Sequence, residues 1–376
     1  MSWRRILVLL AAVVPALSVA RGGHEQSVYP SYYPHEIEIA TIPPAEAVSR
    51  VRDGKLHAYI GDAPNAAAQP AGDALGTATS LGSFVVARLN PKSPLAADAA
   101  GACATVAAAA RAIEAAGFVF HPYPVTPFHG DYLAHADRAE AVRARLREAP
   151  ALPTAPRVRT VGEGAERLVP ARLRAGDGPW DIEVEQVGSR DLIAAATATL
   201  NGWSGPRWVR TGWFHAYRLL AASATPDLRE RLDAGLARLE EDGDRAEVTT
   251  INQARDLVAD LTVGCRAMVI GYTERHEPFN RGFSTGVENV GSDALEGLSS
   301  PMFIRTVKLK DFPWNGWLRL GLAGAPVAAW NPVGGFTDAF GRLMWFAVGD
   351  LAMLPAPYDS TWMLNRVSDV EETPRR

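Results

Sequence analysis

Apolar and polar residues alternate over residues 36–42, and this period of two predicts a strand with one buried face. Three apolar runs predict further strands, which open at residues 56, 82 and 118. Two intervening segments predict helices: residues 45–52, which follow Pro44, and the alanine-dense residues 99–116, which end at Gly117. The predicted order is therefore two β-α-β units in succession.

The same part of the chain is expected to continue to about residue 188. A long helix is predicted over residues 131–148 and a proline-rich linker over 150–156, and residues 158–161 and 182–187 are expected to add edge strands. Two successive β-α-β units favour either a ferredoxin-like split sheet or one lobe of a doubly wound fold.

One short segment resembles a known family. A strand, a helix and a turn of the form Gly-Lys-x-x-Ala-x-Ile-Gly follow one another in residues 37–64, with the turn at residues 54–61. In this order they resemble the opening of a periplasmic solute-binding protein, over fewer than thirty residues. The resemblance implies a lobe like that of solute-binding proteins, with these residues lining a ligand cleft.

The hydrophobic period changes from two to 3.6 beyond residue 190. Four segments show helical spacing of their apolar positions, at residues 191–200, 209–223, 227–241 and 248–272. The chain beyond residue 297 is rich in Gly, Pro and Trp, with one further helix expected at 339–348. The predicted fold class is thus α+β, with an α/β domain over residues 21–188 and a mainly α-helical, Trp-rich domain over residues 189–376.

The first twenty residues predict a secretory signal peptide, with Arg4 and Arg5 before an apolar run and small residues at 18–20. An uncleaved anchor is the alternative, and no later segment is apolar for long enough to span a bilayer. A net charge of -4 and scattered basic residues argue against a nucleic-acid partner. We therefore expect a periplasmic or secreted protein.

Cys103 and Cys265 are the only cysteines of the chain. In an exported protein such a pair favours a disulfide, here between the two halves of the chain. Both cysteines lie among apolar residues, so two separate buried thiols remain the alternative.

The residues with the strongest potential for chemistry lie between 121 and 137. Three prolines stiffen a turn that presents His121 and His129, and Asp131 and His135 lie four residues apart on one face of the helix that follows. Imidazole and carboxylate groups suit a divalent transition metal such as Zn, Cu or Fe. We therefore consider His121, His129, Asp131 and His135 as candidate metal ligands.

Two other interpretations of this stretch stay open. Asp131 could instead orient His135 as a general base, which needs no metal. In the structural interpretation Asp131 only caps the following helix, and the histidines bond neighbouring backbone groups. The spacing matches no defined metal motif.

Tryptophan density marks a second candidate site. Tryptophan can stack on a ligand in a cleft, although a bulky core between helices is the alternative. The candidate ligand-binding residues are Trp203, Trp208, Trp213, His215, Trp314 and Trp317.

Three functions follow from these patterns. The first is a non-catalytic exported protein that binds a small ligand or metal ion between its two parts. The second is a periplasmic enzyme that is metal-assisted or uses a His/Asp acid–base pair. The third is an accessory subunit that packs on a protein partner. Beyond the Asp131 and His135 pair considered above, the sequence does not identify catalytic residues.

Overall fold

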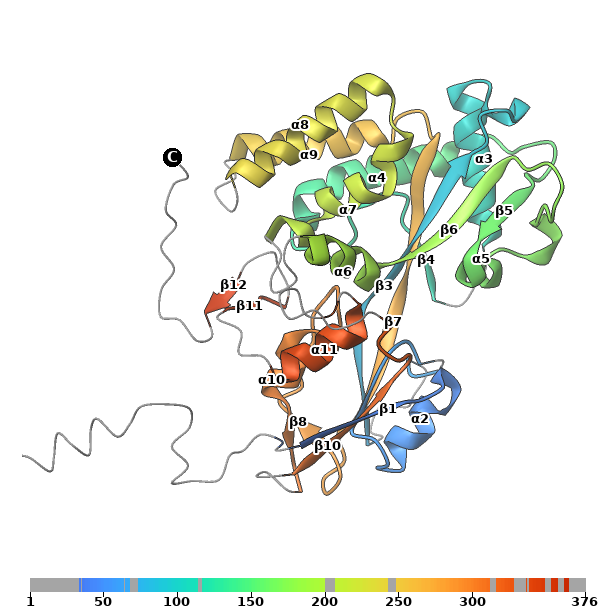
Figure 1. Cartoon of the computed structure of the whole chain (residues 1–376). Coiled ribbons are helices and arrows are strands. Elements are labelled where there is room, and N and C mark those ends of the chain that lie inside the picture. Colours follow the sequence, from blue (N-terminus) through green and yellow to red (C-terminus); the bar gives the residue numbers. More distant parts are fainter. Residues whose placement is uncertain are drawn as a thin grey trace, which may run out of the picture.

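A mixed eight-stranded sheet runs through the computed structural model of the chain (Figure 1). The structure describes residues 34, 36–63, 65–67, 74–113, 117–199, 207–242, 248–311, 316–327, 336, 338–348, 353–357 and 362–364. The strand order is β1-β10-β2-β7-β3-β6-β5, and β4 pairs with β7 beside this path. The predicted signal peptide lies outside the described residues.

The elements of the first half of the chain alternate between strands and helices. The strands are β1 (Glu36–Thr41), β2 (Ala58–Ile60), β3 (Leu75–Leu89), β4 (Phe118–Phe120), β5 (Val158–Val161) and β6 (Ile182–Gly188). The helices are α2 (Pro44–Arg52), α3 (Ala99–Ala112), α4 (Tyr132–Glu148) and α5 (Gly162–Leu168). The predicted strands and helices of this half are present, but β3 begins at Leu75, seven residues before the predicted start at 82, and α3 ends at Ala112.

The second half contains helices and further strands of the same sheet. The helices are α6 (Ser189–Thr199), α7 (Gly212–Leu220), α8 (Pro226–Asp242), α9 (Val248–Leu261), α10 (Pro301–Thr306) and α11 (Ala339–Val348). The strands are β7 (Ala267–Asn280), β8 (Val287–Glu288), β9 (Lys308–Leu309), β10 (Trp317–Leu322), β11 (Met353–Pro355) and β12 (Trp362–Leu364).

The prediction of one helix over residues 248–272 is wrong beyond Leu261. Gly264 and Cys265 take positive φ angles of 82° and 54°, which end the helical path, and the chain returns as β7. β7 pairs with β2, β3 and β4, and β10 inserts between β1 and β2. The sheet therefore takes strands from both sides of residue 189, and the mixed α+β class is confirmed.

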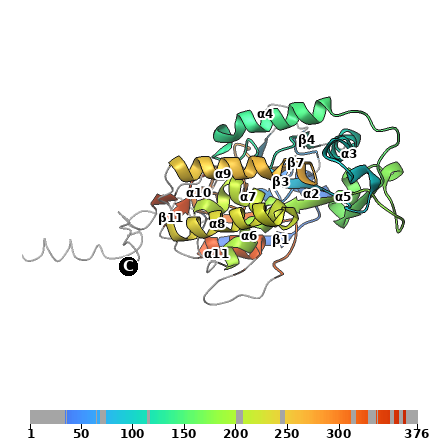
Figure 2. The same ribbon diagram turned by 90° about the horizontal axis from the view of Figure 1, so that it is seen from above.

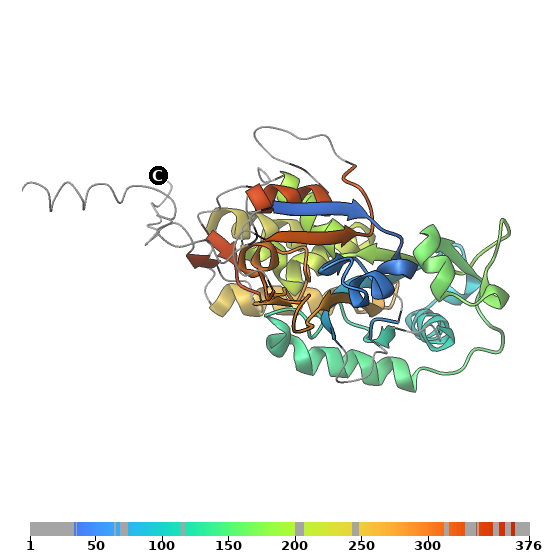
Figure 3. The ribbon, with the colours of Figure 1, turned by 90° about the horizontal axis from the view of Figure 1, so that it is seen from below.

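β3 and β7 form the long antiparallel pair that joins the two ends of the molecule in Figure 1. At one end, β3, β6 and β7 pack with α3, α4, α7 and α9 around the largest hydrophobic core. At the other end, β2 and β10 pack with α10 and α11 around a second core, and α2 covers a third. Seen from below, β1 and β10 lie side by side at this end, with α11 and α2 on opposite sides (Figure 3).

Buried ion pairs lie on β7 and beside it. The Glu277 carboxylate is fully buried, pairs with Arg190 of α6 and accepts the backbone N–H groups of Gly61 and Leu298 at 2.9 and 2.6 Å. Arg210 pairs with Asp293 and Glu296 in the loop that precedes α10. Every one of these charges has a partner, as burial requires.

Cys103 of α3 and Cys265 form a disulfide with a Cα–Cα distance of 5.0 Å. The sequence left open whether the two thiols are joined, and the structure shows that they are. The bond ties α3 to the turn between α9 and β7. No helix in the described part of the chain is long and apolar enough to span a membrane.

Candidate ligand-binding site

The histidines of the 121–135 stretch are buried in the first core. His121, His129 and His135 are 1%, 3% and 3% exposed, and desolvation lowers the pKa of each ring. His121 bonds the carbonyl oxygen of Val125 at 2.8 Å through Nε2, and its Nδ1 lies 3.0 Å from a guanidinium nitrogen of Arg143. The His121 ring therefore bonds to its own turn and to a side chain of α4.

His129 takes part in a chain of hydrogen bonds into α7. Its Nδ1 accepts the backbone N–H of Thr126 at 2.9 Å, which leaves the proton on Nε2. Nε2 then donates to Nδ1 of His215 at 2.9 Å. His215 is fully buried, and burial lowers its pKa well below the usual value, so this pair is neutral.

Asp131 does not cap the helix that follows it, because its side chain makes no capping hydrogen bond to α4. Its two carboxylate oxygens instead accept the backbone N–H of Gly212, the first residue of α7, at 3.0 and 3.1 Å. His135 lies 3.8 Å from the same carboxylate through Nε2, and its Nδ1 lies 3.1 Å from the hydroxyl of Tyr123. A carboxylate at this position stabilises a helix N-terminus.

The four candidate metal ligands are not brought together as a group. His121 bonds backbone and Arg143, His129 bonds His215, and only Asp131 and His135 approach each other. Within the described residues, no three His, Cys, Asp or Glu side chains form a group that could hold a metal ion.

The structure also does not bring the six candidate ligand-binding residues together in one place. Trp208, Trp213 and His215 lie in the first core, where Trp208 packs edge-on against Phe214 at 5.0 Å. Trp317 lies on β10 at the opposite end of the molecule and is 59% exposed. Trp203 and Trp314 lie outside the described residues.

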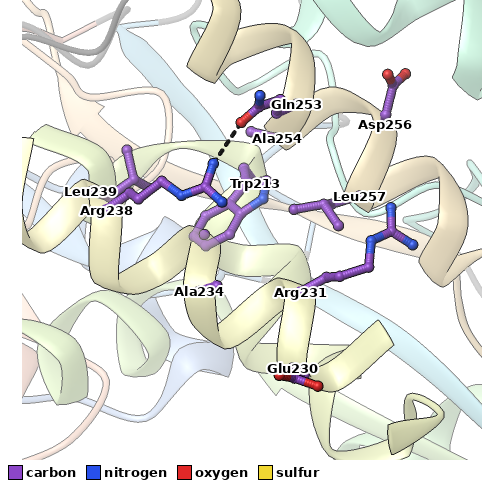
Figure 4. A pocket seen from close by; sticks show the side chains of 11 residues that line it. Trp213, Glu230, Arg231, Ala234, Arg238, Leu239, Gln253, Ala254, Asp256 and Leu257 are labelled. Atoms are coloured by element: carbon purple, nitrogen blue, oxygen red, sulfur yellow. Dashed lines mark hydrogen bonds between the residues drawn. The ribbon is translucent and has the colours of Figure 1, made fainter. Parts of the chain in front are cut away.

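Trp213 borders a cavity of about 430 Å³ between α7, α8 and α9 (Figure 4). These three helices run close together on one side of the molecule (Figure 2). The cavity is lined by Trp213, Glu230, Arg231, Ala234, Gly235, Arg238, Leu239, Gln253, Ala254, Asp256 and Leu257. We call it the Trp213 pocket.

The pocket exists because small residues face each other across α8 and α9. Ala234 and Gly235 of α8 and Ala254 of α9 all line it, and these small residues fill little of the space between the two helices. A Cβ atom at Gly235 would lie 3.4 Å from Cζ2 of Trp213 and 3.4 Å from Leu257. Gly235 thus brings the α8 backbone close to the indole ring.

The indole nitrogen of Trp213 is a buried donor without a partner. The side chain is 3% exposed and Nε1 makes no hydrogen bond. Cζ2, which is bonded to the carbon that carries Nε1, lies against Gly235, so this edge of the indole packs against α8 while Nε1 itself stays buried. A buried donor left unpaired costs about 1–3 kcal/mol, which a ligand acceptor atom would recover.

Two contacts cross the mouth of the pocket from α8 to α9. Arg238 donates to the side-chain oxygen of Gln253 at 2.8 Å (Figure 4), and Arg231 pairs with Asp260 at 2.8 Å. Both arginines are largely exposed, so these contacts are weak enough to rearrange when a ligand enters.

Trp213 is the one predicted residue that lines this pocket. Its α8 and α9 neighbours carried no sequence signal, because they belong to ordinary amphipathic helices. The pairing of small residues across two helices becomes visible only when the helices are placed side by side.

No protein-family model matches the chain, and no curated protein matches it. Solved structures are similar to it at low identity. HbpA2 from Haemophilus parasuis is 12% identical, with a TM-score of 0.44, over 70% of this chain and 55% of that one.

Two further structures show the same kind of likeness. The oligopeptide-binding protein AppA from Bacillus subtilis, in complex with a nonapeptide, is 11% identical over 71% of this chain and 59% of its own, with a TM-score of 0.38. A nickel ABC transporter protein from Bacillus halodurans is 10% identical over 67% and 58%, with a TM-score of 0.37. The chain spans less than two thirds of the length of each of these three structures.

Proposed function

We propose that the protein is an exported, non-catalytic binding protein that holds a small organic molecule in the Trp213 pocket. The observation that carries this proposal is the unpartnered indole N–H, buried at the wall of a cavity of about 430 Å³. Ligand sites have volumes of roughly 300–1,000 Å³, with mostly apolar walls and a few placed polar groups. The Trp213 pocket has this size, and its lining combines apolar side chains with the polar groups of residues such as Arg238 and Gln253.

The export part of the proposal rests on two features. The N-terminal residues have the pattern of a signal peptide, and Cys103 and Cys265 are joined. Disulfides persist in oxidising compartments such as the periplasm. Both features support a periplasmic or secreted protein.

The buried histidines have a supporting role in this proposal. His129, His135 and His215 are at most 3% exposed, so a substrate does not reach their rings in this conformation. Asp131 and His129 instead bond to Gly212 and His215 on either side of Trp213 in α7. The 121–135 stretch therefore fixes the helix that carries the indole, which favours binding over acid–base catalysis.

The test is native mass spectrometry of the mature protein purified from an oxidising compartment, followed by identification of any retained small molecule. Trp213→Phe removes the indole N–H and keeps an aromatic ring, so this variant should lose the retained molecule. Trp208→Phe is the matched control, because Trp208 is buried but does not line the pocket.

Three outcomes decide between the functions. A molecule retained by wild type and Trp208→Phe but not by Trp213→Phe supports the proposal. Equal retention by both variants places the ligand elsewhere and contradicts it. A co-purifying protein chain without any small molecule would favour the accessory-subunit function instead.

A further inference from the structure

We infer that the Trp213 pocket selects an apolar carboxylate, a small acid whose aromatic or aliphatic body lies against the indole. This inference rests on the proposed function and adds the chemical class of the ligand. It follows from the donors, the charges and the apolar surface that line the pocket.

The polar groups that lie nearest to the indole in the pocket include three with donors to offer. Nε1 of Trp213 has a hydrogen and no acceptor. The Gln253 side-chain oxygen is occupied by Arg238, which leaves the Gln253 amide nitrogen as a donor. Arg238 itself carries five N–H groups and only donates. A ligand that satisfies these groups must present acceptor oxygens.

The charges around the pocket also favour an anion. Within the described side chains Arg238 bonds only the neutral Gln253 and makes no ion pair. Of the two carboxylates that line the pocket, Asp256 is paired with Arg138 at 3.2 Å, and Glu230 lies at the lower edge of Figure 4, beyond Arg231. The positive charge beside the indole is therefore Arg238, and a carboxylate is its bidentate partner.

Part of the lining is apolar. Ala234, Leu239, Ala254 and Leu257 supply apolar wall, and Gly235 packs against the edge of the indole. A flat hydrocarbon body gains from burial against this surface. The geometry thus favours one anionic end and one apolar end.

Titration calorimetry with three ligands of one shape tests the charge. Phenylacetate carries the carboxylate, phenylacetamide keeps the acceptor oxygen without the charge, and phenethylamine reverses the charge. We expect phenylacetate to bind about 10- to 100-fold more tightly than phenylacetamide, which is the usual range for a hydrogen bond to a charged group. Phenethylamine should bind most weakly.

Two variants assign the effect to named residues. Arg238→Gln should remove most of the preference for the acid over the amide, and Trp213→Phe should weaken both ligands. Arg218→Gln is the matched control, because Arg218 is exposed on α7 and does not line the pocket. Glycyl-phenylalanine in the same series distinguishes a peptide C-terminus from a free acid as the source of the carboxylate.

The outcomes separate this inference from the proposed function. Equal affinity for acid and amide, a preference for the amine, or an acid preference that survives Arg238→Gln would overturn the carboxylate assignment. A retained molecule without a carboxylate that depends on Trp213 would also overturn it while leaving the proposed function intact. An empty protein that binds none of the four probes would contradict both.

Discussion

Acidification from pH 7 to pH 5 should destabilise the fold through histidines that are buried in the neutral form. Burial lowers the pKa of His129 to about 3 and that of His57 to about 4, against about 6.5 in an unfolded chain. Below pH 6.5 the unfolded chain therefore binds protons that the folded chain does not. The stability that these neutral histidines contribute is fully present above pH 6.5 and is lost as the pH falls toward their pKa in the folded state.

The magnitude follows from the distance between the two pKa values. Each pH unit below 6.5 costs about 1.4 kcal/mol per buried histidine, so His129 alone costs about 2 kcal/mol at pH 5. A loss of this size is a large fraction of the 5–15 kcal/mol by which folded proteins are usually stable. Burial raises the pKa of Asp131 and Asp293, which act in the opposite sense, so the contribution of one histidine must be isolated.

The assay is urea unfolding of wild type and His129→Gln, followed by circular dichroism at pH 8, 7, 6 and 5 with the disulfide intact. Glutamine keeps an acceptor for the backbone N–H of Thr126 but does not titrate. The free-energy difference between wild type and variant should be constant from pH 8 to 7 and should then shrink by about 2 kcal/mol by pH 5. A difference that stays constant down to pH 5 would refute the reasoning.

Three further predictions concern stability. Replacing Cys103 and Cys265 by serine should lower the free energy of unfolding by up to about 5 kcal/mol, because the disulfide spans 162 residues; an unchanged urea midpoint would contradict this. Gly297→Ala should lower the free energy of unfolding, measured by thermal denaturation, by at least about 2 kcal/mol more than Gly117→Ala does. Both glycines have positive φ, but only at Gly297 would a Cβ meet the Glu277 carboxylate, so equal effects would count against that packing. Glu277→Ala should lower the free energy of unfolding by about 3–5 kcal/mol, because it leaves the buried Arg190 charge without a partner. Glu274→Ala, also in β7, should lower it by less than about 1 kcal/mol, and similar losses in the two variants would argue against a buried ion pair.

The sequence predicts local structure well where the pattern is local. α2 begins at Pro44 and α3 is built from alanines, and both lie where composition and proline position place them. β7 was missed because its first residues continue the apolar spacing of α9, and the break depends on the backbone angles of Gly264 and Cys265. Such angles follow from the tertiary fold, to which the disulfide at Cys265 belongs.

The candidate site was predictable only in part. Trp213 belongs to a dense tryptophan cluster and could be proposed from the sequence. Trp208 belongs to the same cluster, but it packs in the first core and does not line the pocket. The capping interpretation of Asp131 is wrong, because its backbone partner, Gly212, lies 81 residues away and not in the helix that follows. Long-range partners of this kind carry no local signal.

The pairing of β1 with β10 has a consequence for how the protein reaches its folded state. Glu36 of β1 lies opposite Trp317 of β10, and β10 also separates β1 from β2. Among the described strands β1 pairs with β10 alone, so it has no neighbour in the sheet until residues 317–322 have been made. This end of the sheet can therefore assemble only after β10, which ends at Leu322, has been made, so its folding depends on contacts between residues far apart in the sequence.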